Sequence, residues 1–129
     1  MARVEVPISV GELVDKVTIL EIKSEKIEDR DKRLNIRREL DALTAVLTPL
    51  VAATPAIAPL KVELRTINGT LWQIEDDIRD CERKRDFGAA FIELARAVYQ
   101  TNDRRAATKR KIDELAGSEL VEEKSYAPY

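Results

Sequence analysis

The strongest structural signal in this chain is the stretch LKVELRTINGTLWQIEDDIRDC, which covers residues 60–81. Its apolar side chains recur at alternating steps of four and three residues: Leu60, Leu64, Ile67, Leu71, Ile74, Ile78 and Cys81. In an α-helix this spacing places all of them on one face. The stretch therefore predicts a long helix with a heptad-like seam that packs against neighbouring helices.

A helix buried on more than one side is expected before this stretch. Ser9 occupies a capping position and Glu12 follows three residues later, which is the spacing of a capping box. One apolar face then runs on to Ile27, while Ile19 and Ile22 point away from it. This helix lies centrally in the bundle or carries a partner surface, and the second possibility predicts a homodimer through it or through the N-terminal segment.

Two more helices are expected from periodicity and from their end signals. Residues 32–48 keep one apolar face until Pro49, which is expected to stop or bend the helix. Residues 87–116 form the last predicted helix, with Asp86 as its N-cap. Gly117 is the natural residue to follow its C-terminal end.

These elements predict an all-α antiparallel bundle of about four helices. A chain of 129 residues suits one domain, so we expect a single helical domain over residues 1–129. Residues 1–8 alternate in polarity and are expected to form a short extended lead. Residues 118–129 form a tail that either folds back over the bundle or stays loose.

The composition excludes several classes of function. Lys and Arg total 22 against 24 Asp and Glu, and this balance argues against a nucleic-acid partner. The chain has no histidine and a single cysteine, Cys81, which removes histidine-based catalysis, histidine-ligated metals and cysteine-cluster zinc sites. No cofactor is expected. Residues 42–60 lack charge, but three prolines interrupt them, so no membrane span is expected. The start of the chain shows no secretory signal, which favours the cytoplasm.

A line of polar side chains accompanies the apolar seam of residues 60–81. It is formed by Asn68, Trp72, Glu75 and Arg79 at steps of four, three and four. The last helix is polar in its middle, where it carries Tyr99, Asn102 and Arg105. Because a short turn makes the two helices antiparallel, we expect these two stretches to face each other inside the bundle.

Three interpretations of this polar surface remain open at the level of sequence. The first is an internal network of hydrogen bonds and ion pairs that fixes the helix register. The second is a ligand site in which Trp72 and Tyr99 are stacking walls and Arg79 or Arg105 binds an anion. The third is an oxygen-ligated Mg²⁺ or Mn²⁺ site that activates water for phosphoester cleavage. Its candidate ligands are Glu75, Asp76, Asp80 and Asp103.

Four motifs resemble a bacterial all-helical family of unknown function. They are ISVGELVDKVTILEIK at residues 8–23, INGTLWQIEDDIR at 67–79, FIELAR at 91–96 and YQTNDRR at 99–105. The resemblance implies a helical fold and an association with genes for surface-polysaccharide or glycosyl transfer. It carries no catalytic residues over to this chain.

The expected function is therefore a non-catalytic binding or interaction protein of the bacterial cytoplasm, serving envelope-polysaccharide assembly as the resemblance implies. Its expected partners are a second copy of the chain, and another protein or a phosphorylated sugar or nucleotide ligand. The alternative is a phosphohydrolase-like enzyme that depends on a divalent metal and acts on a nucleotide or a phosphosugar.

Overall fold

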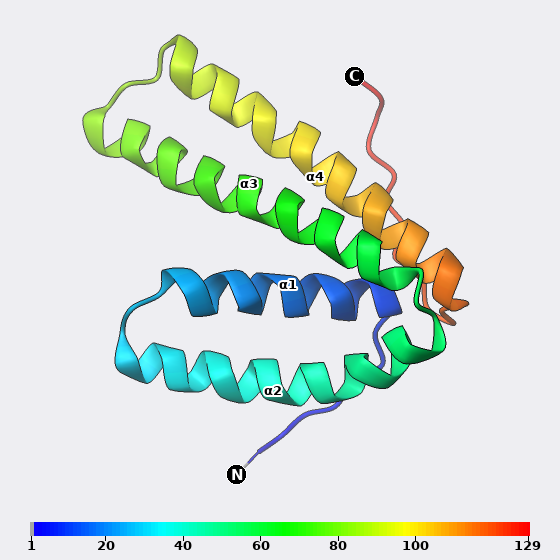
Figure 1. Cartoon of the computed structure of the whole chain (residues 1–129). Helices are drawn as coiled ribbons and strands as arrows, with labels where there is room; N and C mark the ends of the chain where they lie inside the picture. Colours follow the sequence, from blue (N-terminus) through cyan, green and yellow to red (C-terminus); the bar gives the residue numbers. More distant parts are fainter. Residues whose placement is uncertain (1) are drawn as a thin grey trace.

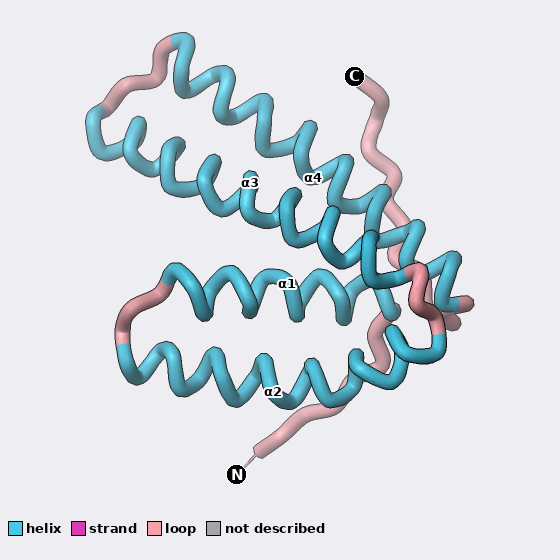
Figure 2. Tube along the Cα trace, in the orientation of Figure 1, coloured by secondary structure: helices cyan, strands magenta, loops and turns pink. Residues whose placement is uncertain are grey.

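The computed structural model describes residues 2–129, and this part of the chain contains four α-helices and no strand. The helices are α1 (Val10–Lys26), α2 (Arg30–Ala53), α3 (Ile57–Lys84) and α4 (Ala89–Ala116). Figure 2 shows that short loops join them and that both ends of the chain are loops. The prediction of an all-α bundle with an extended lead and a tail is confirmed.

The helices form two antiparallel hairpins, α1–α2 and α3–α4 (Figure 1). The hairpins lie together where α2 turns into α3 and diverge toward their other ends (Figure 1). Helix α1 packs against all three other helices. Because α1 is central, its two-sided apolar pattern is explained within one chain. The pattern therefore loses its force as an argument for a homodimer.

The hydrophobic core lies where the two hairpins meet. Its buried members come from all four helices: Leu13, Val14, Val17, Leu47, Ile57, Leu64 and Ile112. The seam of α3 contributes to this core through its first half, whereas Ile78 and Cys81 are only half-buried. The seam thus packs into the core near the start of α3 and against α4 alone near the end of α3.

Three of the predicted helix ends were wrong. Helix α2 continues through Pro49 to Ala53. Pro49 has no N–H, so the only helical hydrogen bond that is lost is the one to the carbonyl of Ala45. Because Ala45 is exposed, water can donate to this carbonyl instead. Helix α3 begins at Ile57 with Pro59 in its first turn, where an N–H has no helical partner in any case.

The third correction concerns the start of α4. Gly88, and not Asp86, is its N-cap residue. The Asp86 carboxylate instead accepts a hydrogen bond from the Gly88 N–H at 3.1 Å, which stabilises the loop itself. At the other end Gly117 caps the helix with φ of 63°, as predicted.

The N-terminus of α1 is held by the end of α4. Ser9 caps the helix as predicted, and its hydroxyl oxygen accepts from the Glu12 N–H at 3.0 Å. The Gly11 N–H donates to Asp113 Oδ1 at 2.6 Å, which places a carboxylate at the positive end of the helix dipole. This contact is so close that a Cβ on Gly11 would lie 2.4 Å from the carbonyl oxygen of Lys109.

The C-terminal tail folds back along α4 (Figure 1). Glu122 accepts a hydrogen bond from Lys109 Nζ at 2.9 Å, and Glu123 accepts one from Arg110 at 2.9 Å. Farther along, the Tyr129 ring meets the Tyr99 ring edge to face at 5.1 Å. The N-terminal lead does not pack on the bundle in this way, because residues 2–8 are all exposed.

Replacing Gly69 with alanine is expected to stabilise the protein. Gly69 lies inside α3, and a Cβ there would have no atom within 4 Å. The alanine therefore adds helix propensity without a clash, and the free energy of unfolding should rise by about 0.5–1 kcal/mol. Urea denaturation of the two proteins checks this. A lower stability would mean that another part of the chain approaches α3 at this position.

Candidate functional site

A buried carboxylate links α1 to both helices of the other hairpin. Asp15 on α1 is fully buried. Its Oδ1 accepts hydrogen bonds from Asn68 Nδ2 on α3 at 2.9 Å and from Arg105 Nε on α4 at 2.9 Å. Arg105 Nη2 pairs with the second oxygen, so the guanidinium and the carboxylate meet through two bonds. We call Asp15, Asn68 and Arg105 the central triad.

Two neighbours complete the surroundings of the central triad. Asn68 Nδ2 is also 2.9 Å from the hydroxyl of Thr18, which is fully buried beside Asp15. Lys109 Nζ lies 3.9 Å from Asp15 Oδ2 and donates to Glu12 at 2.6 Å. The Glu12 carboxylate therefore pairs with Lys109 and not with the backbone of Ser9. Only the half of the capping box that the Ser9 side chain supplies is formed. Lys109 is also buried.

The electrostatic environment keeps Asp15 ionised. Burial opposes ionisation and raises its pKa, but the hydrogen bonds from Arg105 and Asn68 and the charges of Arg105 and Lys109 outweigh this effect. The pKa of Asp15 consequently lies below its usual value. The central triad is thus a satisfied ion pair with an amide, of the kind that fixes how helices pack.

This pKa shift predicts a loss of stability in acid. A carboxylate whose pKa is lowered by folding contributes stability above its unfolded pKa of about 3.9, and the contribution disappears as the pH falls through the folded value. We expect the free energy of unfolding to drop below about pH 4, and to drop less steeply in Asp15→Asn. Urea denaturation between pH 7 and pH 3 measures both slopes. Parallel slopes would show that Asp15 is not the group that titrates.

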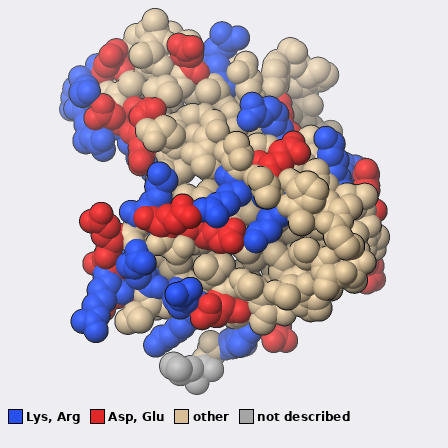
Figure 3. Space-filling model, viewed as in Figure 1, with Lys and Arg blue, Asp and Glu red and all other residues tan. Residues whose placement is uncertain are grey.

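A groove opens between the two hairpins, directly beside the central triad. It has a volume of about 500 Å³ and is formed by α1, α3 and α4. We call it the interhairpin groove. In Figure 3 it is the notch between the hairpins, with acidic and basic side chains along its edges. Ile19 and Ile22 of α1 lie on one side, opposite Leu71 and Val98.

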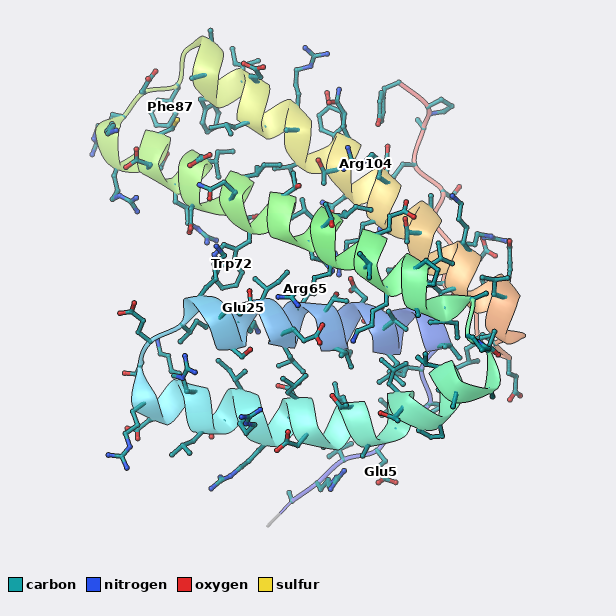
Figure 4. The ribbon with its side chains drawn as sticks, viewed as in Figure 1. Glu5, Glu25, Arg65, Trp72, Phe87 and Arg104 are labelled. Carbon is teal, nitrogen blue, oxygen red and sulfur yellow. The ribbon has the colours of Figure 1, made fainter. Side chains whose placement is uncertain are left out.

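Six of the seven predicted ligand-site residues line this groove. They are Asn68, Trp72, Glu75, Arg79, Asn102 and Arg105. Figure 4 shows Trp72 projecting from α3 toward the C-terminal part of α1. In residues 2–129, no side-chain hydrogen bond engages the Trp72 indole N–H or the Asn102 amide. The groove therefore offers an aromatic surface together with polar groups that a ligand can use.

Tyr99 does not belong to this group. It is 42% exposed, and its ring contacts Tyr129 of the tail instead. The groove wall thus has one aromatic side chain, Trp72. The expectation that Tyr99 forms a second stacking wall is corrected, because the tail that covers this side of α4 was not placed by the sequence pattern.

The four predicted metal ligands are not gathered around a common point. Across residues 2–129, no group of three or more His, Cys, Asp or Glu side chains is arranged to hold a metal ion. Asp80 pairs with Lys84 at 2.7 Å and with Arg83, and Asp103 accepts a bond from the Tyr129 hydroxyl. Glu75 and Asp76 do line the groove. In the described residues, the four side chains therefore do not form a preassembled metal centre.

Sequence reasoning missed the most important residue of the site, Asp15. A signal for it was present, since Gly11, Asp15 and Thr18 follow one another at steps of four and three. They form a small and polar stripe beside the apolar face of the helix. Such a stripe indicates a buried polar contact with another helix.

The fold and the groove define a class, that of small helical-bundle proteins with a ligand-sized groove. The chain matches a family model over residues 4–128, and that model is described as "Family of unknown function (DUF6165)". The protein belongs to this family. No curated protein and no solved structure matches the chain. None of the described helices is long and apolar enough to cross a membrane.

Proposed function

We propose that this chain is a non-catalytic binding protein of the bacterial cytoplasm and that its interhairpin groove receives a small polar ligand. The observation that carries the proposal is the groove itself, which combines an indole with unengaged polar groups beside a fixed ion pair. Its volume of about 500 Å³ falls within the range of small-molecule sites. Service in envelope-polysaccharide assembly, which the family resemblance implies, would suit such a protein.

Different side chains of the groove supply the apolar and the polar contacts to the ligand. The face of the Trp72 ring offers apolar contact, and Ile22 and Leu71 add to this surface. The Asn102 amide supplies both a donor and an acceptor. Arg105 uses Nε and Nη2 on Asp15, which leaves Nη1 without a partner in residues 2–129. Because Asp15 fixes this guanidinium, little side-chain freedom is lost when a ligand meets it.

The single tryptophan of the chain makes a direct test possible. We expect the Trp72 indole N–H resonance to shift saturably with at least one class in a panel of saccharides, sugar phosphates, nucleotides and polyamines. No shift with any member of the panel would contradict the proposal.

Asn102→Ala should weaken the binding found in this way. Loss of one ligand hydrogen bond costs about 1.4 kcal/mol, so the Kd should rise about tenfold. Asn35→Ala is the matched control, because Asn35 is an exposed asparagine on α2 outside the groove. Isothermal titration of both variants gives the comparison. An equal effect of the two substitutions would place the ligand elsewhere.

A further inference from the structure

Each positive charge that lines the interhairpin groove is paired with a carboxylate. Of its two arginines, Arg105 is held by Asp15 through two bonds. The other, Arg79, has Nη2 at 3.4 Å from Glu75 Oε2. Asp76 also lines the groove and forms no ion pair in the described chain. The groove therefore presents two guanidinium groups but no uncompensated positive charge.

We propose, resting on the proposed function, that the groove selects an uncharged, hydroxyl-rich ligand of the saccharide type and excludes its phosphorylated forms. Asp15 and Glu75 set this selectivity, because each neutralises one of the two arginines that would otherwise bind a phosphate. The phosphorylated ligand expected from the sequence pattern relied on these arginines being free.

Phosphate recognition requires guanidinium groups that are free to bind the phosphate, and this groove lacks them. A phosphate monoester carries nearly two negative charges at neutral pH and binds through guanidinium groups that direct free donors at it. Here the paired carboxylates and Asp76 would repel it, and repulsion at this range is only partly screened. Asp15 could leave Arg105 only by giving up a buried partner, which is costly. The Glu75–Arg79 pair is exposed and separates at a smaller cost, so it contributes the smaller part of the selectivity.

An uncharged polyol meets no such obstacle. Its hydroxyl groups accept hydrogen bonds from the free Nη1 of Arg105 and from the Asn102 amide, and they donate to the carboxylates of Glu75 and Asp76. The apolar face of a sugar ring packs on the half-buried indole of Trp72. The groove suits an organic cation less well. Its single aromatic ring does not enclose a cation, and Asp76 is the one carboxylate of the groove without a compensating positive charge.

The experiment compares matched ligands on the intact protein. The probes are methyl glucoside with glucose 1-phosphate, N-acetylglucosamine with its 1-phosphate, inorganic phosphate and spermidine. Titrations that follow the Trp72 indole resonance give the Kd of each. We expect each uncharged sugar to bind at least about tenfold more tightly than its phosphate at low ionic strength.

Removal of a neutralising carboxylate should reduce this preference. In Glu75→Gln, which changes an exposed side chain and leaves the core intact, the Kd for the sugar phosphates should fall about threefold. In Asp15→Asn, which keeps an acceptor for Asn68 but frees Arg105, the fall should be about tenfold. Asp80→Asn is the control, since Asp80 lies on the same helix outside the groove and should change neither Kd.

The outcomes separate this inference from the proposed function. If a sugar phosphate binds as tightly as its uncharged partner or more tightly, or if spermidine alone binds, the groove is a ligand site but its selectivity is not as proposed. If Glu75→Gln leaves the sugar phosphates unchanged, Glu75 does not set the selectivity. If no ligand shifts the indole resonance, the proposed function itself fails.

Discussion

Replacing Asp15 with alanine is expected to lower the free energy of unfolding by about 3 kcal/mol. The substitution removes the carboxylate that both Arg105 and Asn68 contact, and it leaves Asn68 buried with one acceptor fewer. The expected loss lies near the lower end for a broken buried ion pair, because the Arg105 side chain keeps 29% exposure and water can reach it. Urea denaturation at pH 7 measures this loss.

A surface ion pair provides the control for this prediction. Asp80 pairs with Arg83 and Lys84 on an exposed part of α3, so Asp80→Ala should cost less than about 1 kcal/mol. A loss of similar size in both variants would indicate that Asp15 contributes no more than a solvent-exposed carboxylate. The central triad would then not be what holds α1 to the α3–α4 hairpin.

Replacing Gly11 with alanine is expected to destabilise the protein by about 2–3 kcal/mol. The new Cβ would stand 2.4 Å from the Lys109 carbonyl oxygen and 2.8 Å from Asp113 Oδ1. The first of these neighbours is backbone, so α1 and α4 must move apart. That movement also weakens the hydrogen bond from the Gly11 N–H to Asp113.

The Gly69 variant is the matched comparison, because it makes the same chemical change in an open position. The structure predicts opposite signs for the two glycines: Gly11→Ala lowers the free energy of unfolding and Gly69→Ala raises it. Thermal or urea denaturation of both variants in one buffer is sufficient. Stabilisation by Gly11→Ala would contradict the close approach of α1 to α4.

The periodicity of the sequence predicted the helices well, because most of them are amphipathic. The seam of residues 60–81 lies within α3, and the Ser9 cap begins α1. The helix ends were less predictable where proline occurs. Pro49 and Pro59 both lie inside helices. Pro49 is tolerated because the carbonyl that it leaves unpaired belongs to an exposed residue, and Pro59 is tolerated because it lies in the first turn of α3. Whether a proline ends a helix depends on such surroundings, which periodicity does not report.

The site was predicted only in part, for a related reason. The polar positions of α3 and α4 follow from their spacing, and six of them line one groove. Asp15, which contacts Asn68 and Arg105 among them, comes from a third helix more than fifty residues earlier in the chain. Pairing between distant helices depends on how the hairpins pack, and Tyr99 illustrates the same point because its ring contacts Tyr129 of the tail. Spacing along one helix contains no information about either contact.

The central claim is that Asp15 and Arg105 join α1 to the α3–α4 hairpin at the base of the groove. A double-mutant cycle of Asp15→Ala and Arg105→Ala, followed by urea denaturation, tests it most directly. The structure predicts a coupling free energy of about 2 kcal/mol between the two side chains. Additive effects within about 0.5 kcal/mol would contradict the claim.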